Sequence, residues 1–321
     1  MEIYAGYDGG GTKTACVLTD RNGKYLGFGA GGPSNYLFCG KETAAESVRR
    51  ATEAAFRNAG LPVQHLKAAY MAGAAIKMQN GAAHVPFFRT CIDAELIVCE
   101  SDIYPIWYGS VGTQDAVVSI AGTGALTYVC SETGLIRVGG WGPLLGDEGS
   151  GYDLGLQALR LSCRMYDGRA ASDQAFQRAV FAHYQVETPG ELLKKLNSGD
   201  TRSAVASVAK IVFQLYKDGN QTAEMLLEHC ADEIALAVDT AVSKAETGKQ
   251  YPLILSGGVV HKESPLYEML RKRLVRPEGG ICEVVSLQIH PAAAAAALAL
   301  HHSGLEESAK CLMKQAKEMQ R

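Results

Sequence analysis

The chain has 321 residues, enough for about two domains, and 47% of them are hydrophobic and 20% charged, as in globular proteins with a sizeable core. Lys and Arg number 31 against 34 Asp and Glu, so no basic excess exists to bind nucleic acid. The longest uncharged apolar run, Pro291 to Leu300, has half the roughly 20 residues of a membrane span. The N-terminus shows no export signal. We therefore expect neither nucleic acid nor a membrane as a partner.

The nine cysteines are at least eight positions apart, which excludes a CxxC zinc or redox motif. Without an export signal, disulfides are not expected, and most cysteines should be small buried side chains. The histidines show no metal-ligand spacing. These features indicate a reduced, cytoplasmic protein.

The first predicted elements are three strands joined by turns, at residues 3–7, 15–18 and 25–28. A glycine-rich turn follows the first strand, and Asn22-Gly23, a pair that supplies two positive-φ positions, predicts a hairpin after the second. Apolar and small residues recur at helical spacing over 41–58, which predicts a helix. Further strands are expected at 68–73 and 95–99.

The same order recurs in the second half, with predicted strands at 116–120, 126–129 and 135–138. Gly11 and Gly122 are 111 positions apart, as are Thr12 and Thr123. This constant offset between matching turns predicts two related three-stranded units, one in each domain.

From residue 151 the pattern is mainly helical. Helices are expected at 152–165, 173–184, 190–196, 203–216 and 222–245, then a strand at 252–256, a helix at 265–274, a strand at 283–287 and two final helices. The predicted fold class is α/β with two domains and a hinge near 110–115. The N-terminal domain covers 1–112, the C-terminal domain covers 113–290 with a helical insertion, and the final helices, about 291–321, pack back on the first domain.

Three glycine motifs have residues suited to a nucleotide. The glycines in 8–14 let backbone N–H groups converge on an anion, and Asp8 could hold a hydrated Mg²⁺ on the phosphates. This is neither a Walker A loop nor a GxGxxG fingerprint, because a strand follows it. A second tight turn occupies 122–124, and small residues at 256–258 would let a purine approach the backbone. Each motif taken singly also has an interpretation without a ligand. Residues 8–14 could be a flexible hairpin, 122–124 a structural turn, and 256–258 a place where a helix packs closely on a strand.

In order and spacing, these motifs resemble the phosphate-1, phosphate-2 and adenosine motifs of the actin/hexokinase/Hsp70 ATPase superfamily. Residues 139–151, Gly-Gly-Trp-Gly-Pro-Leu-Leu-Gly-Asp-Glu-Gly-Ser-Gly, resemble the G-W-G-x-x-x-G-D-E-G-S signature of N-acetylglucosamine kinases and the BadF/BadG/BcrA/BcrD ATPase family. The resemblance spans essentially the whole chain. It implies two actin-like (ribonuclease H-like) ATPase domains flanking a cleft, and transfer of the γ-phosphate of ATP to the 6-hydroxyl of an amino sugar.

The resemblance also implies the roles of individual residues and an assembly. The residues expected to bind ATP are Gly9, Gly10, Gly11, Thr12, Lys13, Gly122, Thr123, Gly124, Ser256, Gly257 and Gly258. The residues expected to bind the sugar are Ser34, Asn35, Asp102, Gly140, Trp141, Gly142 and Asp147. Mg²⁺ would lie near Asp8, and the family is often homodimeric.

The acceptor hydroxyl needs a base, and the family places an aspartate at the end of a strand that leads into a helix. Asp102 has this position after the strand at 95–99, where an aspartate could equally cap the helix. Glu100 is the rival base, although strand alternation would turn only one face to the cleft.

The sequence departs from the family pattern at two places. Residues 103–105, Ile-Tyr-Pro, stand where the family has small residues, and residues 125–126, Ala-Leu, replace the Ser-Asn of the amino-sugar kinases. By itself, 31–35 would be a turn and Trp141 a core aromatic residue. The acceptor therefore stays open among N-acetylglucosamine, which is favoured, N-acetylmuramic acid, glucosamine and an unacetylated hexose.

Two other classes of function compete with a kinase. The first is a BadF/BcrA-type ATPase that activates a radical dehydratase or reductase through a [4Fe–4S] cluster held by cysteines of two subunits. No cysteine lies next to the phosphate or adenosine motifs. The second is a non-catalytic sugar sensor, which the short segment before Asp8 and the presence of Asp102 make less favoured.

Overall fold

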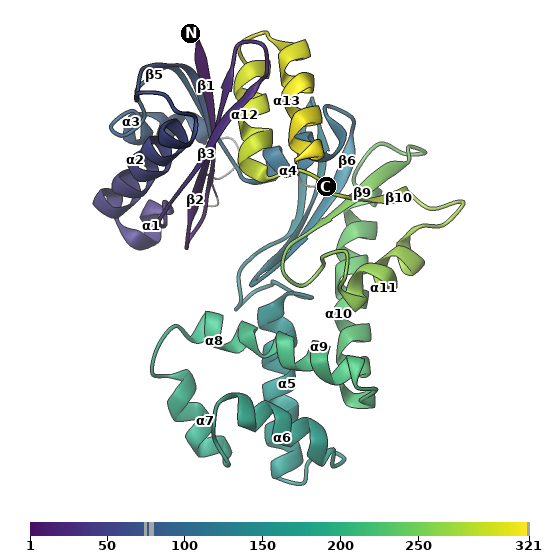
Figure 1. Ribbon diagram of the computed structural model, residues 1–321. Helices are drawn as coiled ribbons and strands as arrows, with labels where there is room; N and C mark the ends of the chain where they lie inside the picture. Colours follow the sequence, from purple (N-terminus) through teal and green to yellow (C-terminus); the bar gives the residue numbers. More distant parts are fainter. Residues whose placement is uncertain (74–75, 77–79, 320–321) are drawn as a thin grey trace. The chain divides into compact units, whose positions relative to one another are not determined.

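The computed structural model describes residues 1–73, 76 and 80–319, and its chain divides into two compact units (Figure 1). Unit 1 consists of Met1–Thr113 and Leu287–Arg321, and unit 2 of Gln114–Ser286. Residues 320 and 321, at the end of the last predicted helix, lie outside the described residues.

Unit 1 contains a five-stranded mixed sheet in the order β3-β2-β1-β4-β5. Its strands are β1 (Ile3–Gly9), β2 (Thr14–Asp20), β3 (Tyr25–Gly31), β4 (Leu66–Gly73) and β5 (Ala94–Glu100). The first three strands are antiparallel, whereas β4 and β5 run parallel to β1. The carboxyl ends of β1, β4 and β5 therefore meet at one edge of the sheet.

Helix α2 (Lys41–Asn58) covers one face of this sheet. The glycines of β3 explain how close it lies, because β-carbons at Gly27, Gly29 and Gly31 would be only 2.0–2.5 Å from backbone carbonyl oxygens of α2. Alternate positions of a strand face the same side. A stripe of three glycines thus lets the helix contact the strand backbone directly.

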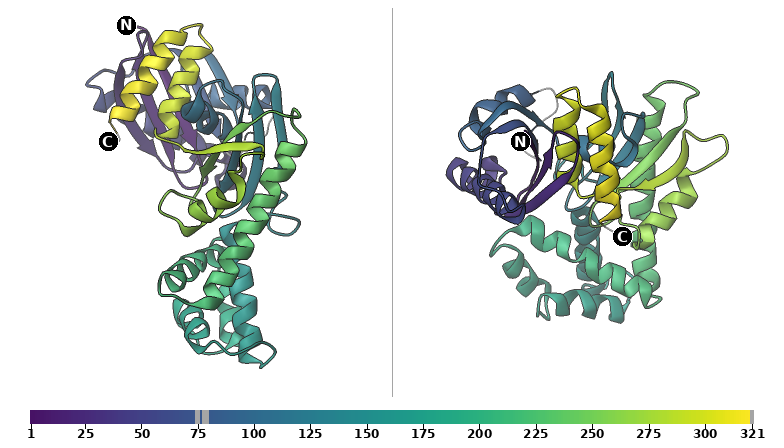
Figure 2. Two further views of the ribbon diagram at one scale, coloured as in Figure 1. Left: turned by 90° about the vertical axis from the view of Figure 1, so that its right-hand side faces the viewer. Right: turned by 45° about the horizontal axis from the view of Figure 1, so that its top comes forward.

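The opposite face is covered by α12 (Pro291–His301), next to which lies α13 (Glu306–Glu318); both are drawn in yellow in Figures 1 and 2. Every residue from Ala292 to Leu300 is buried. A β-carbon at Gly6 of β1 would lie 1.9 Å from the backbone nitrogen of Ala296. Small residues on both elements let α12 pack against the centre of the sheet.

The described residues of unit 1 form four further short helical segments. They are α1 (Tyr36–Cys39), a 3₁₀ turn η1 (Gly81–His84), α3 (Val85–Phe88) and α4 (Ile103–Val111). Their lengths explain why hydrophobic periodicity does not reveal the first three, since one turn is too short to show a repeat.

Unit 2 repeats the topology of the first sheet. Its strands are β6 (Ala116–Ala121), β7 (Ala125–Ser131), β8 (Gly134–Gly139), β9 (Tyr251–Ser256) and β10 (Ile281–Ser286). Their order is β10-β9-β6-β7-β8, with β6, β7 and β8 antiparallel and β9 and β10 parallel to β6. This is the order of unit 1 read from the other edge. The predicted structural repeat is therefore confirmed.

Helices make up the rest of unit 2, and Figure 2 shows several of them, in teal and green, gathered beyond the sheet. They are α5 (Gly151–Tyr166), α6 (Gln174–His183), α7 (Pro189–Leu196), α8 (Thr201–Ser207), α9 (Ala209–Lys217), α10 (Gln221–Ser243) and α11 (Pro265–Leu274). Side-chain caps fix several starts, such as Ser150, whose Oγ accepts the amide of Asp153 at 3.1 Å. Helix α10 packs on β7 and β8 and contributes to a core shared with β6 and β9.

Two local predictions are wrong. The helix expected over 203–216 is two helices, because α8 ends at Ser207 and α9 begins at Ala209. The Asn22-Gly23 turn has one positive φ, at Gly23, and not two. The Gly23 amide donates to the carbonyl of Asp20, and the ladder shifts register between Leu18 and Thr19, so the hairpin is closed by a longer loop than a two-residue turn.

The cysteines, all within the described residues, are free thiols. Burial raises the pKa of Cys16 and of Cys99 to about 12, so these thiols stay protonated at neutral pH. Among the residues that the structure describes, no helix has the length and apolar character needed to cross a bilayer.

Candidate functional site

The first glycine turn joins β1 to β2 in unit 1. The amide of Gly10 donates to the carbonyl of Lys13 at 2.9 Å, and this bond closes the turn. Gly11, Thr12 and Lys13 are exposed, and no atom of the residues that the structure describes lies within 4 Å of a β-carbon placed at Gly11. The turn thus presents open backbone to a ligand, as a phosphate-binding turn requires.

Asp8 lies at the base of this turn, at the carboxyl end of β1. Burial raises its pKa, and the Lys13 ammonium opposes this shift. His290, the residue that caps α12 through its Nδ1, also lies within electrostatic reach of Lys13. Burial and Lys13 both lower the pKa of His290. No sequence motif predicts His290 at this site, because it comes to the turn from the far end of the chain.

Asp102 follows β5, at the N-cap position of α4, but its side chain makes no capping hydrogen bond. The hydroxyl of Ser101 donates to its Oδ1 at 3.1 Å. Burial raises the pKa of Asp102, the Ser101 hydrogen bond opposes this, and the nearby charge of Asp8 raises it further. The two carboxylates are therefore close enough to interact, as a base and a metal ligand at one site would be.

Glu100, the rival base, belongs to another cluster. Its carboxylate accepts a hydrogen bond from the hydroxyl of Tyr70, and Tyr70 lies in the core between the sheet and α12. The ring of His302 lies 5.7 Å from that of Tyr70. Because the carboxylate of Glu100 already accepts a hydrogen bond from the buried hydroxyl of Tyr70, Asp102 is the better candidate for the general base.

Ser34 and Asn35 lie beside the first turn. Their amides donate to the carbonyl of Gly10 at 3.1 and 3.2 Å, and a β-carbon at Gly9 would lie 2.4 Å from Ser34 Oγ. The two residues are only 2% and 7% exposed, yet within the described part of the chain Ser34 Oγ and Asn35 Oδ1 have no hydrogen-bond partner. Buried polar atoms without partners are rare and costly. Their presence beside Asp8 indicates a site that a polar ligand completes.

The second glycine turn, at 122–124 in unit 2, is held by the start of α5. The amides of Gly151 and Tyr152 donate to the carbonyls of Gly122 and Thr123 at 2.8 and 3.3 Å. The amide of Gly122 donates to the carbonyl of Gly124 at 2.9 Å. These hydrogen bonds hold the carbonyl groups of Gly122 and Thr123 toward the start of α5.

The predicted adenosine motif lies next to this turn, at the end of β9. Gly257 has φ +116°, and a β-carbon there would lie 2.3 Å from the carbonyl oxygen of Ala121. That same carbonyl accepts the amide of Val259 at 3.0 Å. Ser256, Gly257 and the second phosphate turn are therefore contiguous within unit 2.

The signature segment 139–151 forms a loop after β8. Trp141 is 67% exposed, and the guanidinium of Arg137 lies 4.6 Å from its ring centroid, so the alternative of a core aromatic residue is wrong. Gly140 and Gly142 both have positive φ. The loop thus presents a large ring to solvent, where it could contact a sugar.

Asp147 in this loop is buried, and its Oδ2 accepts a hydrogen bond from Nη2 of Arg202 at 2.9 Å. Arg202 lies on α8, 55 residues farther along the chain. This partner could not be predicted from the sequence, because no local pattern shows where α8 packs.

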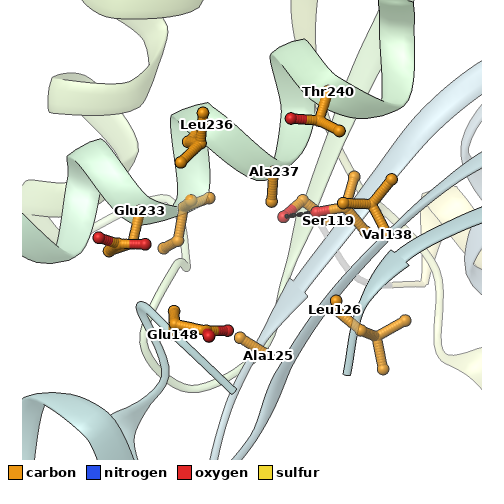
Figure 3. Close-up of a pocket in the computed structure, with 12 residues that line it drawn as sticks. Ser119, Ala125, Leu126, Val138, Glu148, Glu233, Leu236, Ala237 and Thr240 are labelled. Atoms are coloured by element: carbon orange, nitrogen blue, oxygen red, sulfur yellow. Dashed lines mark hydrogen bonds between the residues drawn. The ribbon is translucent and has the colours of Figure 1, made fainter. Parts of the chain in front are cut away.

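A cavity of about 240 Å³ lies between the sheet of unit 2 and α10 (Figure 3). Ala125 and Leu126, the residues that depart from the family pattern, line it, together with Ser119. In Figure 3 Glu148 lies beside Ala125, whereas Glu233 belongs to α10 on the other side of the cavity. The departure therefore borders a partly apolar cavity that also carries two carboxylates.

The structure brings the predicted residues together in two groups, each within one unit. Unit 1 holds the first turn, Asp8, the sugar loop at 34–35 and Asp102. Unit 2 holds the second turn, the adenosine motif and the signature loop. Among the described residues, no group of three or more His, Cys, Asp or Glu could hold a metal. A single carboxylate nevertheless fits Mg²⁺ brought by phosphates, since this ion keeps several waters, and Asp8 meets that need.

Comparison with known proteins agrees with these motifs. Residues 5–299 match the BadF/BadG/BcrA/BcrD ATPase family. An N-acetylmuramic acid/N-acetylglucosamine kinase of Clostridium acetobutylicum is 26% identical over 278 residues, or 85% of this chain and 90% of that protein. An N-acetyl-D-glucosamine kinase of Dictyostelium discoideum is 25% identical over 315 residues, or 94% and 98%.

Among solved structures, a Chromobacterium violaceum protein ascribed to the N-acetylglucosamine kinases superposes with a TM-score of 0.73 at 26% identity, covering 94% of this chain and 99% of that one. A ROK hexokinase of Thermus thermophilus, at 18% identity and a TM-score of 0.57, shares the fold. The resemblance in the signature loop is thus confirmed, and the chain belongs to the BadF/BadG/BcrA/BcrD ATPase family.

Proposed function

We propose that this protein is an ATP-dependent kinase that transfers the γ-phosphate of ATP to the 6-hydroxyl of an amino sugar, with N-acetylglucosamine as the favoured acceptor. The observation that carries the proposal is the group in unit 1. There the carboxylates of Asp8 and Asp102 lie within electrostatic reach, and the unpartnered polar atoms of Ser34 and Asn35 are buried beside the same turn.

In this mechanism Asp102 accepts the proton of the sugar hydroxyl as the oxygen forms its bond to the γ-phosphorus. Its raised pKa makes it a stronger base than an exposed aspartate. The Ser101 hydroxyl holds the carboxylate in place. Buried Ser34 and Asn35 would bind sugar hydroxyls, and so would Asp147 of unit 2.

Phosphoryl transfer depends mainly on positioning and on neutralising charge. Backbone amides of the turns at 9–13 and 122–124 would bind the phosphates, and residues 256–258 would bind the adenosine. Bound Mg²⁺ would neutralise phosphate charge, with Asp8 as its protein ligand. Lys13 adds a positive charge beside this turn.

N-acetylmuramic acid stays an alternative acceptor, since the Clostridium acetobutylicum relative is named as a kinase of both sugars. Use of Mg²⁺, a homodimeric assembly and a cytoplasmic location stay predictions of the sequence.

The test is a coupled ADP-release assay with Mg-ATP and N-acetylglucosamine, glucosamine, N-acetylmuramic acid and glucose. We expect turnover with N-acetylglucosamine, and the other three sugars test the range of acceptors. Absence of turnover with all four sugars would contradict the kinase. Iron and a visible absorption band in the anaerobically purified protein would instead support an ATPase that activates a radical enzyme.

A further inference from the structure

Asp147 lies under the guanidinium of Arg202. The side chain of Asp147 is 5% exposed and that of Arg202 45%, so the arginine covers the carboxylate while part of it stays in contact with solvent. A buried carboxylate is costly unless a charged or hydrogen-bonding partner compensates it. Arg202 supplies this compensation from α8, a helix outside the two glycine turns and the signature loop.

The backbone of Asp147 also restricts its carboxylate. Asp147 has φ +61°, a left-handed conformation that non-glycine residues seldom adopt and that often occurs at functional sites. Its carbonyl accepts the amide of Ser150 at 3.1 Å. The position of the carboxylate is therefore fixed from both ends, by the loop backbone and by Arg202.

The same ion pair lies against the second phosphate turn. A β-carbon placed at Gly124 would be 2.8 Å from Nη2 of Arg202 and 2.8 Å from Oδ2 of Asp147. Nη2 already donates to Asp147, and a guanidinium has five N–H donors in all. Arg202 and Asp147 therefore place a hydrogen-bonded ion pair next to the turn where the phosphates of ATP are proposed to bind.

We propose that Arg202 is a positioning residue that couples recognition of the acceptor sugar to the phosphate turn. It holds Oδ2 of Asp147, which directs Oδ1 to a sugar hydroxyl, and its guanidinium lies directly beside Gly124 of the phosphate turn. This inference rests on the proposed kinase function. It assigns Arg202 a role that neither the sequence motifs nor the family signature indicates.

The test compares Arg202→Gln and Arg202→Lys with the control Arg178→Gln, an exposed arginine on α6 whose side chain contacts Gln174 of the same helix. Arg202→Gln should raise the KM for the sugar about 10- to 100-fold, the scale of losing a charged hydrogen bond, and should lower kcat. Arg202→Lys keeps the charge without the planar fork and should recover part of kcat. The control should stay within twofold of the wild type.

A double-mutant cycle with Asp147→Asn separates positioning from general stability. If Arg202 acts through Asp147, the double variant should have nearly the same sugar KM as Asp147→Asn alone. Additive effects, or an unchanged sugar KM in Arg202→Gln, would overturn the inference. Thermal melting shows whether Arg202→Gln is folded. If it is not, Arg202→Lys is the deciding variant, and a sugar KM and kcat equal to those of the wild type would overturn the inference.

Sugar binding measured by calorimetry distinguishes failure of the proposed kinase activity from failure of the proposed role of Arg202. If the wild type binds sugar but releases no ADP, the proposed kinase activity is wrong, while weaker sugar binding by Arg202→Gln would still support the contact with Asp147 as a positioning contact. If the wild type neither binds nor phosphorylates any of the four sugars, both proposals are wrong.

Discussion

Replacing Asp102 by Asn is expected to abolish most catalysis and to stabilise the protein at neutral pH. The amide has nearly the same shape but cannot accept the proton of the sugar hydroxyl, so kcat should fall by at least about 10²-fold, the usual scale for a general base. Burial raises the pKa of Asp102, so the ionised carboxylate is destabilised in the folded protein. Asn does not carry that charge.

The expected pH dependence follows from the direction of this shift. Because the pKa of Asp102 is raised in the folded state, the folded protein holds the proton more tightly than the unfolded chain does. Stability is therefore lost as the pH rises above the ordinary value of 3.8, by about 1.4 kcal/mol for each unit by which the pKa is raised. In a domain the size of unit 1, a change of 1 kcal/mol in the free energy of unfolding shifts Tm by about 3–4 °C.

Calorimetric melting between pH 4 and pH 8 measures this effect, with ADP release and ADP binding measured on the same samples. The Asn variant should have the higher Tm at pH 7, and the difference should shrink toward pH 4. ADP affinity should not change. Asp93→Asn, an exposed carboxylate of unit 1, is the control and should shift Tm by no more than about 2 °C.

Two results would refute the reasoning. A kcat near that of the wild type would show that Asp102 is not the base. A lower Tm than the wild type at pH 7 would show that its burial does not cost folding free energy. In the wild type, the acid limb of kcat/KM for the sugar should lie above pH 3.8, because the raised pKa moves deprotonation of Asp102 upward.

Three other changes test the packing and the site. Gly29→Ala places a β-carbon 2.1 Å from a carbonyl oxygen of α2 and should lower the free energy of unfolding by about 3 kcal/mol or more, whereas Gly190→Ala, in open space at the start of α7, should change it by under about 1 kcal/mol; urea titration measures both. Ser34→Ala removes a hydroxyl without a partner, so Tm should stay equal or rise while the sugar KM rises about tenfold; a clear loss of Tm would contradict this. With a thiol reagent, only the exposed Cys282 and Cys311 should react rapidly before unfolding, and fast modification of further thiols would contradict the described burial.

The repeated three-stranded units could be predicted from sequence because their signals are local. Glycine-rich turns and short alternating strands specify a hairpin within a few residues, and the constant offset between Gly11 and Gly122 links the two copies. Helix α2 begins and ends as predicted, at Lys41 and Asn58, since its amphipathic pattern is long. The break between α8 and α9 has no such marker, because Val208 continues the apolar pattern.

The candidate site was only partly predictable. Motifs identify residues that lie within a few positions of a turn, such as Asp8 and Asn35. Arg202 and His290 reach the turns through packing of α8 and α12, and such long-range contacts leave no local pattern. That Ser34 is buried without a partner is likewise a property of the folded site.

The position of α12 in the chain affects how unit 1 forms during synthesis. The helix that buries the centre of the first sheet ends at His301, whereas the N-terminal part of that unit, which contains all five strands of the sheet, ends at Thr113. At 5–20 residues per second, a ribosome needs roughly 10–40 s to make the intervening segment. During that time Tyr4, Tyr70 and the other residues of this face are not yet buried by α12. Nascent chains stalled between the two segments should therefore bind chaperones that recognise exposed apolar segments more strongly than complete chains do.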